Sequence, residues 1–272
     1  MATILDRIVQ TKRDELARSM RDRPLAEVMR QAQTAPPPRD FVKAVTGSSP
    51  HGINLIAEIK RKSPSAGVIR PDLDPVEIAC TYHQAGAASL SILTDRTYFD
   101  GRLEYIEEVK AAVPLPVLRK DFTIDPYQIY ETRAAGADAV LLIAEILDPD
   151  QISEMVNLAA ACSLGVLIEF HSAETLAKVF AAVTRTPPPH CILGINNRDL
   201  HRQQTDIAAT ARLAAKLEPG TPFVSESGIK TRADVEAVQA AGACAILVGE
   251  SILERVDADV AIKILLGQSR ER

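Results

Sequence analysis

Short apolar segments alternate with helical stretches along most of this chain, at intervals of roughly 25 to 35 residues, about the length of one strand–helix unit in an eight-unit barrel. The unit of helix, Ala-Gly-Ala and apolar segment recurs at Ala85–Ala87, Ala135–Ala137 and Ala241–Ala243. Glycine at such a position can take the left-handed conformation that ends a helix. This weak internal repetition predicts parallel strands joined by helices.

Eight strands are predicted from the apolar segments: Leu55–Lys60, Ser89–Thr94, Val117–Lys120, Ala139–Ala144, Gly165–Glu169, Cys191–Asn196, Pro222–Ser225 and Ala245–Gly249. Helices are predicted to begin at Asp74-Pro75, Asp125-Pro126 and Asp148-Pro149, because the carboxylate caps the helix and proline suits its first position. Such strands form either a closed barrel or an open doubly wound sheet. No G-x-G-x-x-G follows the first strand, so we expect an α/β fold with a single (β/α)8 TIM barrel.

One barrel domain accounts for residues 1–272, of which residues 1–48 precede the first strand as an N-terminal extension. Apolar residues recur at mostly helical spacing from Thr3 to about Arg30, and the stiff segment Thr34–Pro38 follows. We therefore expect a helical extension whose apolar stripe packs on the barrel. The periodicity alone leaves open whether that stripe covers a core or a site.

The composition is that of a soluble globular protein with a small-molecule partner. The formal charge of −5, from 31 basic and 36 acidic residues, favours neither nucleic acid nor an anionic membrane. No apolar run approaches the roughly 20 residues of a membrane span. The four cysteines are far apart among apolar residues and lack zinc-like spacing, and the N-terminus has no apolar signal core. We expect a cytoplasmic protein without disulfides.

The first strand ends in two opposite charges, Glu58 and Lys60, which point to the same side because side chains alternate along a strand. The plain alternative is a salt bridge that only stabilises the strand end. Other strands also end in polar residues, namely Lys120, Glu169, Asn196, Arg198 and Glu226. Active sites of such barrels lie at the C-terminal strand ends, so these residues predict a functional cluster. We expect the pKa of Lys60 or Lys120 to be tuned toward neutrality, as a proton donor requires.

The last two strands lead into glycine turns, Ser225–Ile229 and Leu247–Ser251, each expected just before a helix. Backbone amides there predict a phosphate site, although a glycine turn without a ligand is the alternative. Glu250 fits only if its carboxylate points away from the phosphate. The five histidines show no metal spacing, and only His171 falls at a strand end, so we expect no metal.

These motifs resemble the indole-3-glycerol phosphate synthase family over nearly the whole chain. The residues that carry the resemblance are Ile56–Ser65, Leu93–Asp95 with Tyr98-Phe99, Leu118–Phe122, Leu141–Ala144, Glu169, Gly194–Arg198, Ser225–Ile229 and Leu247–Gly249. The resemblance implies a ring closure without cofactor or metal. The substrate would be 1-(o-carboxyphenylamino)-1-deoxyribulose 5-phosphate, and the products indole-3-glycerol phosphate, carbon dioxide and water.

The resemblance also implies roles for individual residues. Lys120 would be the general acid that protonates the substrate ketone. Lys60, held by Glu58, would bind anionic groups of the substrate and share in proton transfer. Glu169 would assist the dehydration. The substrate-binding residues would be Ser63, Phe99, Leu141, Ile143, Asn196, Arg198, Glu226, Ser227 and Leu247, and the phosphate-binding residues Gly228, Gly249 and Glu250. Phe99, Leu141, Ile143 and Leu247 would form an apolar wall for the aromatic ring.

The resemblance further implies that the extension folds over the barrel mouth. It implies an anionic sugar-phosphate substrate and a monomer or weak homo-oligomer, and it leaves association with other tryptophan-pathway enzymes open. Two segments depart from the family pattern. His201–Gln204 stands where threonine and phenylalanine are more usual, and Arg102 replaces a small residue.

Two other functions compete with the synthase reaction. A lysine-based aldolase would use Lys60 or Lys120 to form a Schiff base that borohydride traps. A non-catalytic sugar-phosphate-binding barrel would bind the ligand without turnover. The number of acids and bases at strand ends argues against the binding protein, because binding alone does not require them.

Overall fold

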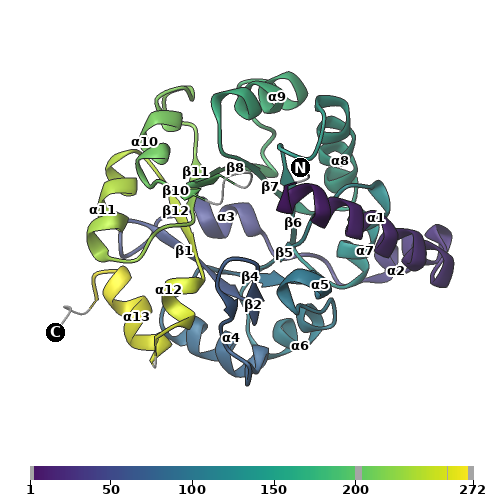
Figure 1. Ribbon diagram of the computed structural model, residues 1–272, viewed down its shortest axis with the longest axis horizontal. Helices are drawn as coiled ribbons and strands as arrows, with labels where there is room; N and C mark the ends of the chain where they lie inside the picture. The colour runs from purple at the N-terminus through teal and green to yellow at the C-terminus, as the bar shows by residue number, and fades with distance from the viewer. Residues whose placement is uncertain (1–2, 200–203, 256, 269–272) are drawn as a thin grey trace.

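Eight parallel strands close into a barrel in the computed structural model, which describes residues 3–199, 204–255 and 257–268. The barrel strands are β1 (Asn54–Ile59), β4 (Ser89–Leu93), β5 (Val117–Lys120), β6 (Ala139–Ile143), β7 (Gly165–Phe170), β8 (Cys191–Asn196), β11 (Phe223–Glu226) and β12 (Ala245–Val248). They follow one another around the ring, and β1 closes it by pairing with both β4 and β12 (Figure 1). The predicted (β/α)8 barrel is confirmed, with each predicted strand end within one residue of the observed one.

Helices surround the strands on the outside of the ring (Figure 1). They are α4 (Pro75–Gln84), α5 (Arg96–Phe99), α6 (Tyr105–Ala112), α7 (Pro126–Ala134), α8 (Pro149–Ala161), α9 (Ala173–Val183), α10 (Ala208–Ala214), α11 (Arg232–Ala240), α12 (Glu250–Leu253) and α13 (Ala258–Leu265). The three predicted aspartate caps are confirmed, since each carboxylate accepts hydrogen bonds from backbone amides of the first turn. The glycines of the three Ala-Gly-Ala segments have φ angles of 98°, 81° and 99°, as their predicted left-handed role requires.

Two apolar cores lie on opposite sides of the strand ring. Leu55, Ala57 and Ile59 of β1 point outward to the layer between strands and helices. Ile56 points inward, where it joins apolar side chains of the other strands. The pleat that puts Ile56 inside the barrel also directs Glu58 inward, one step closer to the C-terminal end. At the mouth of the barrel, polar side chains therefore lie above a closely packed apolar layer.

The N-terminal extension consists of three helices, α1 (Ile4–Asp22), α2 (Leu25–Thr34) and α3 (Phe41–Thr46). The single helical stretch expected to about Arg30 is interrupted at Pro24, because proline lacks the N–H that would continue α1. The stiff segment after Thr34 ends α2, as predicted, whereas α3 was not predicted. Its buried Phe41 and Val45 join the inward-facing core, and Figure 1 shows α3 within the outline of the strand ring.

Among the described residues, two pairs of short strands lie in the loops that follow the barrel strands. β2 (Lys62–Ser63) pairs with β3 (Gly67–Val68), and β9 (Arg198–Asp199) pairs with β10 (Gln204–Thr205). Of the unusual segment His201–Gln204, only Gln204 belongs to the described residues. Among the described helices, none combines the length and apolar character needed to cross a bilayer.

A buried aspartate anchors the end of the barrel opposite the mouth. Asp138 is fully buried just before β6, and its carboxylate accepts hydrogen bonds from the amides of Arg39 at 2.6 Å and Val117 at 2.7 Å. The Lys110 ammonium binds the same carboxylate. Arg39 in turn donates to three carbonyls, those of Lys110, Val113 and Leu115. The segment that leads into α3 is thus fixed to the base of the barrel.

Removing this carboxylate should cost stability without affecting catalysis. We expect Asp138→Ala to lower the free energy of unfolding by about 3 to 5 kcal/mol, because it leaves the Lys110 ammonium buried without its partner. Denaturant unfolding measures the loss, and Asp259→Ala, which breaks the exposed pair with Lys263, serves as a control with little effect. A large fall in kcat in folded Asp138→Ala enzyme would contradict the view that the base of the barrel serves stability while catalysis takes place at its mouth.

Candidate active site

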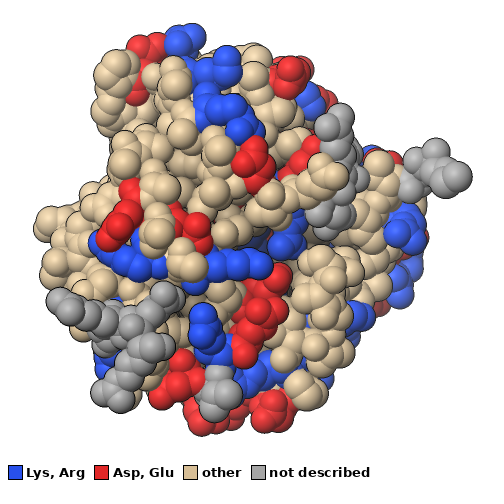
Figure 2. Space-filling model, turned by 60° about the vertical axis from the view of Figure 1, so that its left-hand side comes forward, with Lys and Arg blue, Asp and Glu red and all other residues tan. Residues whose placement is uncertain are grey.

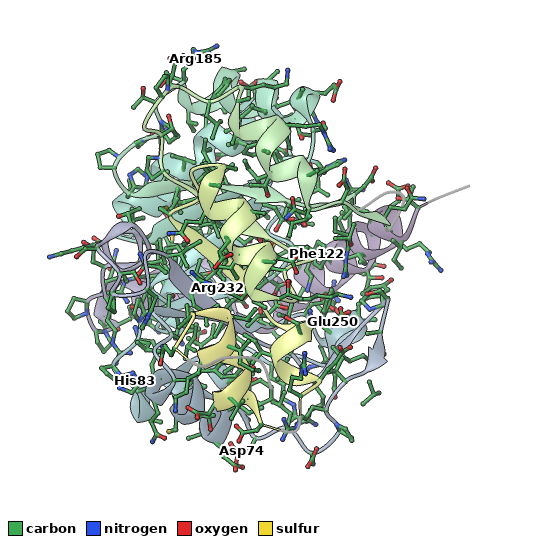
Figure 3. The ribbon with its side chains drawn as sticks, turned by 90° about the vertical axis from the view of Figure 1, so that its left-hand side faces the viewer. Asp74, His83, Phe122, Arg185, Arg232 and Glu250 are labelled. Atoms are coloured by element: carbon green, nitrogen blue, oxygen red, sulfur yellow. The ribbon has the colours of Figure 1, made fainter. Side chains whose placement is uncertain are left out.

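A cleft of about 1100 Å³ opens at the C-terminal ends of the strands. All predicted site residues except Ser63 line it: Glu58, Lys60, Phe99, Lys120, Leu141, Ile143, Glu169, Asn196, Arg198, Glu226, Ser227, Leu247, Gly228, Gly249 and Glu250. Figure 3 shows two cleft residues from different parts of the ring, Phe122 and Glu250, near the same end of the barrel. One cleft therefore receives side chains from β1, β5, β6, β7, β8, β11 and β12.

Glu58 and Lys60 form an ion pair on one wall of the cleft. Their Oε1 and Nζ atoms lie 2.7 Å apart, and the side chains are 9% and 11% exposed. The prediction that they share a face is confirmed. The pair is a salt bridge at a strand end, as the structural alternative proposed, and it also lines the cleft. The two interpretations of this pair are therefore compatible.

Lys120 lies among carboxylates at the centre of the cleft. Its Nζ lies 2.8 Å from Oε2 of Glu169 and 3.9 Å from Oε2 of Glu226. Asn196 Nδ2 donates a hydrogen bond of 2.8 Å to the other oxygen of Glu169. Glu169 and Glu226 are each only 2% exposed. One cation, two buried carboxyl groups and one amide thus form a compact cluster contributed by four strands.

The electrostatics of this cluster differ from the sequence-based expectation. Burial alone would lower the pKa of Lys120, but the charges of Glu169, Glu226 and Glu58 outweigh it and hold the pKa above its usual value. The expected lowering toward neutrality is therefore wrong for Lys120. The sequence places each carboxyl group at a strand end, but the direction of the Lys120 pKa shift depends on how many of these groups lie close to the same ammonium.

The two carboxyl groups beside Lys120 are driven apart in pKa. Burial and the adjacent charge of Glu169 raise the pKa of Glu226 well above its usual range. Burial also acts to raise the pKa of Glu169, but the Lys120 charge and the hydrogen bonds from Lys120 and Asn196 lower it. The ionised form is thus favoured at Glu169 and the protonated form at Glu226, as two coupled like groups require. Pairs of this kind divide acid and base roles between like groups.

Gly194 on β8 makes room for this arrangement. A Cβ atom on Gly194 would collide with Oε1 of Glu226 and would lie 3.1 Å from the side chain of Leu167. Glycine therefore permits the Glu226 carboxyl to approach the neighbouring strand closely. The run Gly194-Ile195-Asn196 combines this space with the amide that orients Glu169.

Arg198 crosses the mouth from β9. Its guanidinium donates to Ser65 Oγ at 3.1 Å and to Thr205 Oγ1 at 3.4 Å, and it lies 3.5 Å from Oε2 of Glu250. Ser63 lies beneath this contact, away from the cleft. Its Oγ atom is 3.3 Å from Ser65 Oγ and accepts the amide of Ala66. Ser63 thus stabilises the loop that Arg198 contacts.

The two glycine turns differ from each other. Gly249 directly precedes α12, as expected, whereas α11 begins only at Arg232, after a loop in which Ser227 and Gly228 have φ angles of 64° and 77°. Thr231 and Asp234 form a capping box at the start of α11. A Cβ atom on Gly249 would lie 2.6 Å from Oε1 of Glu58, so the turn also packs on the Glu58–Lys60 pair.

Several cleft residues were missed by the sequence analysis: Leu93, Asp121, Phe122, Thr205, Ile229, Lys230, Val248 and Ser251. Phe122 follows Lys120 by two residues and its ring centroid lies 6.1 Å from that of Phe99, so the alternation of the Leu118–Phe122 segment could have identified it. Lys230 could have been found as a cation within the predicted phosphate loop.

His171 lies at the end of β7 but outside the cleft lining. Its Nδ1 atom hydrogen-bonds Glu145, and Nε2 lies 3.8 Å from Asp199. The hydrogen bond to Glu145, together with nearby negative charge, raises the pKa of His171.

Within the described ranges, no three His, Cys, Asp or Glu side chains are grouped to hold a metal ion. Figure 2 shows basic and acidic side chains interspersed over one face of the surface.

The raised pKa of Glu226 predicts how the stability of the protein depends on pH. An unfolded glutamate ionises near 4.5, whereas folded Glu226 retains its proton, so this residue destabilises the protein increasingly as pH rises above 4.5. Glutamine does not titrate, so Glu226→Gln should be more stable than wild type at neutral pH, with a larger gain at pH 8 than at pH 5. Thermal or denaturant unfolding at several pH values measures this difference. Glu154→Gln, on the exposed side of α8, should show no such trend, and a gain independent of pH would contradict the assignment.

Comparison with known proteins finds one matching family and relatives of similar sequence. A model of the family described as indole-3-glycerol phosphate synthase matches residues 5–265. The indole-3-glycerol phosphate synthase of Rhodopirellula baltica is 47% identical over 97% of this chain and 99% of the relative. That of Rhodospirillum rubrum is 44% identical over 98% and 100%.

Among solved structures, a 3-hexulose-6-phosphate synthase superimposes with a TM-score of 0.61 at 22% identity, over 79% of this chain and 99% of the other. The tryptophan synthase subunit alpha of Legionella pneumophila superimposes with a TM-score of 0.56 at 16% identity, over 79% and 92%. At such identities the likeness concerns the barrel fold alone.

Proposed function

The chain belongs to the indole-3-glycerol phosphate synthase family, and from this premise we propose how its residues divide the work of the reaction. The family's reaction closes the ring of 1-(o-carboxyphenylamino)-1-deoxyribulose 5-phosphate, with loss of carbon dioxide and water, as a step of tryptophan biosynthesis. The observation that carries the proposed division is the cluster of Lys120 with Glu169 and Glu226, facing the Glu58–Lys60 pair across one cleft.

Lys120 is the proposed general acid of ring closure. The attacking atom is a ring carbon, which is a modest nucleophile, so the ketone must be polarised as the new carbon–carbon bond forms. The neighbouring carboxylates keep Lys120 protonated at neutral pH. The alkoxide that develops on the ketone carbon is a far stronger base than these carboxylates, so the ammonium gives up its proton as that charge appears. A Schiff-base role fits poorly, because an attacking amine must be neutral and needs a lowered pKa.

We expect Lys120→Met to lower kcat by about 10² to 10⁴, the contribution of a positioned acid, with a smaller change in KM. Lys120→Arg should restore little, because arginine keeps its charge but gives up a proton poorly. Steady-state kinetics with the carboxyphenylamino substrate, followed by indole fluorescence, measures both. Lys263→Met, on the exposed side of α13, is the control. If Lys120→Met retains more than about a tenth of wild-type kcat, well short of that acid contribution, the acid role moves to Lys60.

The remaining polar residues complete the proposed sequence of steps. Attack by the ring carbon that bears the carboxylate gives an intermediate whose aromatic ring is restored when carbon dioxide leaves. Glu169, ionised and oriented by Asn196, then assists loss of the hydroxyl group as water by stabilising the positive charge that develops on the nitrogen or by moving a proton. Lys60, held by Glu58, binds anionic substrate groups and shares in proton transfer. Glu226 and Ser227 position the substrate.

The apolar side of the cleft is the proposed wall for the aromatic ring. Leu141, Ile143 and Leu247 are nearly fully buried in the inward-facing core, and Phe99 packs at its edge. A flat apolar ring bound there would remove water from the reacting carbon, which strengthens the charge interactions of Lys120. Arg198 and its contacts border the cleft opening.

The glycine turns after β11 and β12 are the proposed phosphate site. Gly228, Gly249 and Glu250 would offer backbone amides, and Lys230 adds a cation on the same border of the cleft. The Glu250 carboxylate is directed to Arg198, at 3.5 Å, which keeps part of its charge compensated beside an anionic ligand. A phosphate held here would pin one end of the substrate while the ketone faces Lys120.

Gly249→Ala should raise KM at least about tenfold, because a methyl group blocks the approach of the phosphate to the amides. The same methyl group would also press on Glu58, so KM alone does not isolate the phosphate. Competitive inhibition by inorganic phosphate separates the two effects, and its Ki should rise in parallel with KM. Gly136→Ala, where a φ of 81° strains alanine but no atom lies near the added methyl group, controls for a general loss of stability away from the cleft. A raised KM with unchanged Ki would remove the phosphate from this turn.

The extension is proposed to cover the barrel mouth, and the enzyme to act in the cytoplasm as a monomer or weak homo-oligomer. Leu5 and Ile8 of α1 join the inward-facing core, which supports the covering role. The four cysteines are free, as suits a reducing compartment. The large apolar side chains most exposed among the described residues, Leu25, Val68 and Val260, lie far apart in the sequence, which favours a monomer. Association with other enzymes of the tryptophan pathway is left open.

A further inference from the structure

A lysine lies on the buried face of helix α1, outside the cleft lining. Leu5, Ile8 and Lys12 are the buried residues of this helix, and the Lys12 side chain is only 8% exposed. A buried ammonium is costly unless carboxylates compensate it. Lysine at this position therefore needs an explanation that apolar packing of the extension does not supply.

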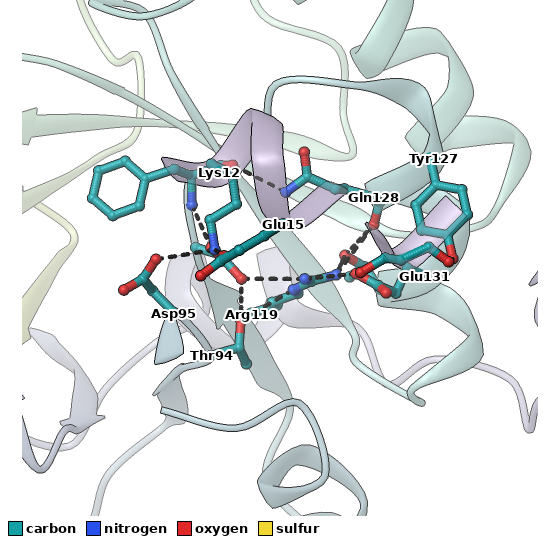
Figure 4. A network of polar contacts seen from close by, with 12 residues as sticks. Lys12, Glu15, Thr94, Asp95, Arg119, Tyr127, Gln128 and Glu131 are labelled. Atoms are coloured by element: carbon teal, nitrogen blue, oxygen red, sulfur yellow. Dashed lines mark hydrogen bonds and ion pairs between the residues drawn. The ribbon is translucent and has the colours of Figure 1, made fainter. Parts of the chain in front are cut away.

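Three carboxylates surround the Lys12 ammonium (Figure 4). Its Nζ lies 2.8 Å from Glu15 on the same helix, 3.0 Å from Asp95 and 2.9 Å from Asp121. Asp121 has a second cation, since Arg119 Nη2 lies 3.1 Å from its other oxygen. For Asp95, Lys12 is the cation within ion-pair distance among the described residues. Removing Lys12 would thus leave Asp95 beside Asp121 with no cation of its own.

The two aspartates occupy the ends of adjacent barrel strands and lead directly into the cleft. Asp95 caps α5 by accepting the amide of Tyr98, and α5 carries Phe99 to the cleft wall. Asp121 stands between Lys120 and Phe122, which both line the cleft, and accepts the amide of Phe122. The rings of Phe99 and Phe122 lie 6.1 Å apart. The distance between the two carboxylates is therefore linked to the geometry of the acid and of the aromatic wall.

We propose that Lys12 is a positioning residue for ring closure: its ammonium, bound between Asp95 and Asp121, sets the spacing between the Phe99 turn and the Lys120–Phe122 segment. The inference rests on the proposed role of Lys120 and extends it to the N-terminal extension. In this scheme α1 does more than cover the mouth. Among the described residues, it supplies the charge that pairs with both buried carboxylates at these neighbouring strand ends.

The first test is Lys12→Met. Without the ammonium, Asp95 and Asp121 repel each other, and a shift of about 1 Å at Lys120 can cost about 10² in rate. We expect kcat to fall ten- to a hundredfold, and Lys12→Arg, which keeps the charge, to retain more activity than Lys12→Met. Tyr127→Phe is the matched control. The Tyr127 hydroxyl also joins α1 to the barrel, by donating to the carbonyls of Ser19 and Arg23, but it takes no part in the ion pairs of Asp95 and Asp121. A loss in Tyr127→Phe as large as that in Lys12→Met would reduce Lys12 to general attachment.

The second test uses charge and pH to separate positioning from attachment. Asp95 faces Lys12 and Glu15 from α1 and Asp121, with its partner Arg119, from β5. Burial already raises the pKa of Asp95. Loss of Lys12 raises it further, so Asp95 in Lys12→Met should take up a proton at a higher pH than in wild type as the pH is lowered across the range in which the enzyme is assayed. The kcat of Lys12→Met relative to wild type should then rise toward low pH, and Lys12→Met/Asp95→Asn should recover at least threefold in kcat, because asparagine still caps α5.

A constant ratio across this pH range, together with no recovery in the double variant, would overturn the proposal. So would a Lys12→Met enzyme with kcat within twofold of wild type. If Lys12→Met does not fold by circular dichroism, Asp95→Asn and the double variant replace it, and a kcat of the double variant at least tenfold below that of Asp95→Asn would overturn the proposal, because Lys12 would then act without the Asp95 charge. A wrong assignment of Lys120 as the general acid is recognised separately. It would show as a high kcat of Lys120→Met, whatever the kcat values of the Lys12 variants are.

Discussion

Compensation of buried charge at one end of a closed barrel is the constraint on which the rest of this structure depends. The inside of the ring is apolar up to the level of Ile56 and Leu118, and directly above it two carboxyl groups are only 2% exposed. Such groups are tolerated only when cations and donors meet them at short range. Lys120 provides that charge for Glu169 and Glu226, as Lys60 does for Glu58. Because Lys120, Glu169 and Glu226 come from three different strands, their compensation exists only when the ring is closed.

The two ends of the barrel meet this constraint differently. At the base, Asp138 is fully buried and accepts hydrogen bonds from two amides and from the Lys110 ammonium, so its charge is well satisfied. At the mouth, burial and the charge of Glu169 raise the pKa of Glu226, and the nearby Lys120 ammonium is shared with Glu169. A carboxyl group whose pKa rises on folding lowers stability at neutral pH. This is the pattern expected where a site is arranged for chemistry and the rest of the fold for stability.

Most of the fold, and the membership of the cleft, could be predicted because the relevant signals are local. Strand alternation, aspartate caps and helix-ending glycines are set by a few neighbouring residues, and the barrel rule then brings strand ends such as Lys120 and Glu169 together. Quantities that depend on several distant residues could not be predicted. The pKa of Lys120 follows from three carboxylates on other strands. Ser63 turns away from the cleft because it bonds within its own loop, and α3 is too short for a periodic signal.

The partners of the first three helices bear on the order in which the chain is made. Arg23 is held by Glu131 and by the Tyr127 hydroxyl, Ala35 by Arg133, and the Arg39 amide by Asp138. All of these partners lie in the second quarter of the sequence or just beyond it. Because the extension precedes these partners in the chain, it has no complete docking surface until they have been synthesised, unlike the usual case in which the earlier unit of a chain folds first. Until the strands that bind them have been synthesised, the amphipathic helices of the extension keep their apolar faces uncovered.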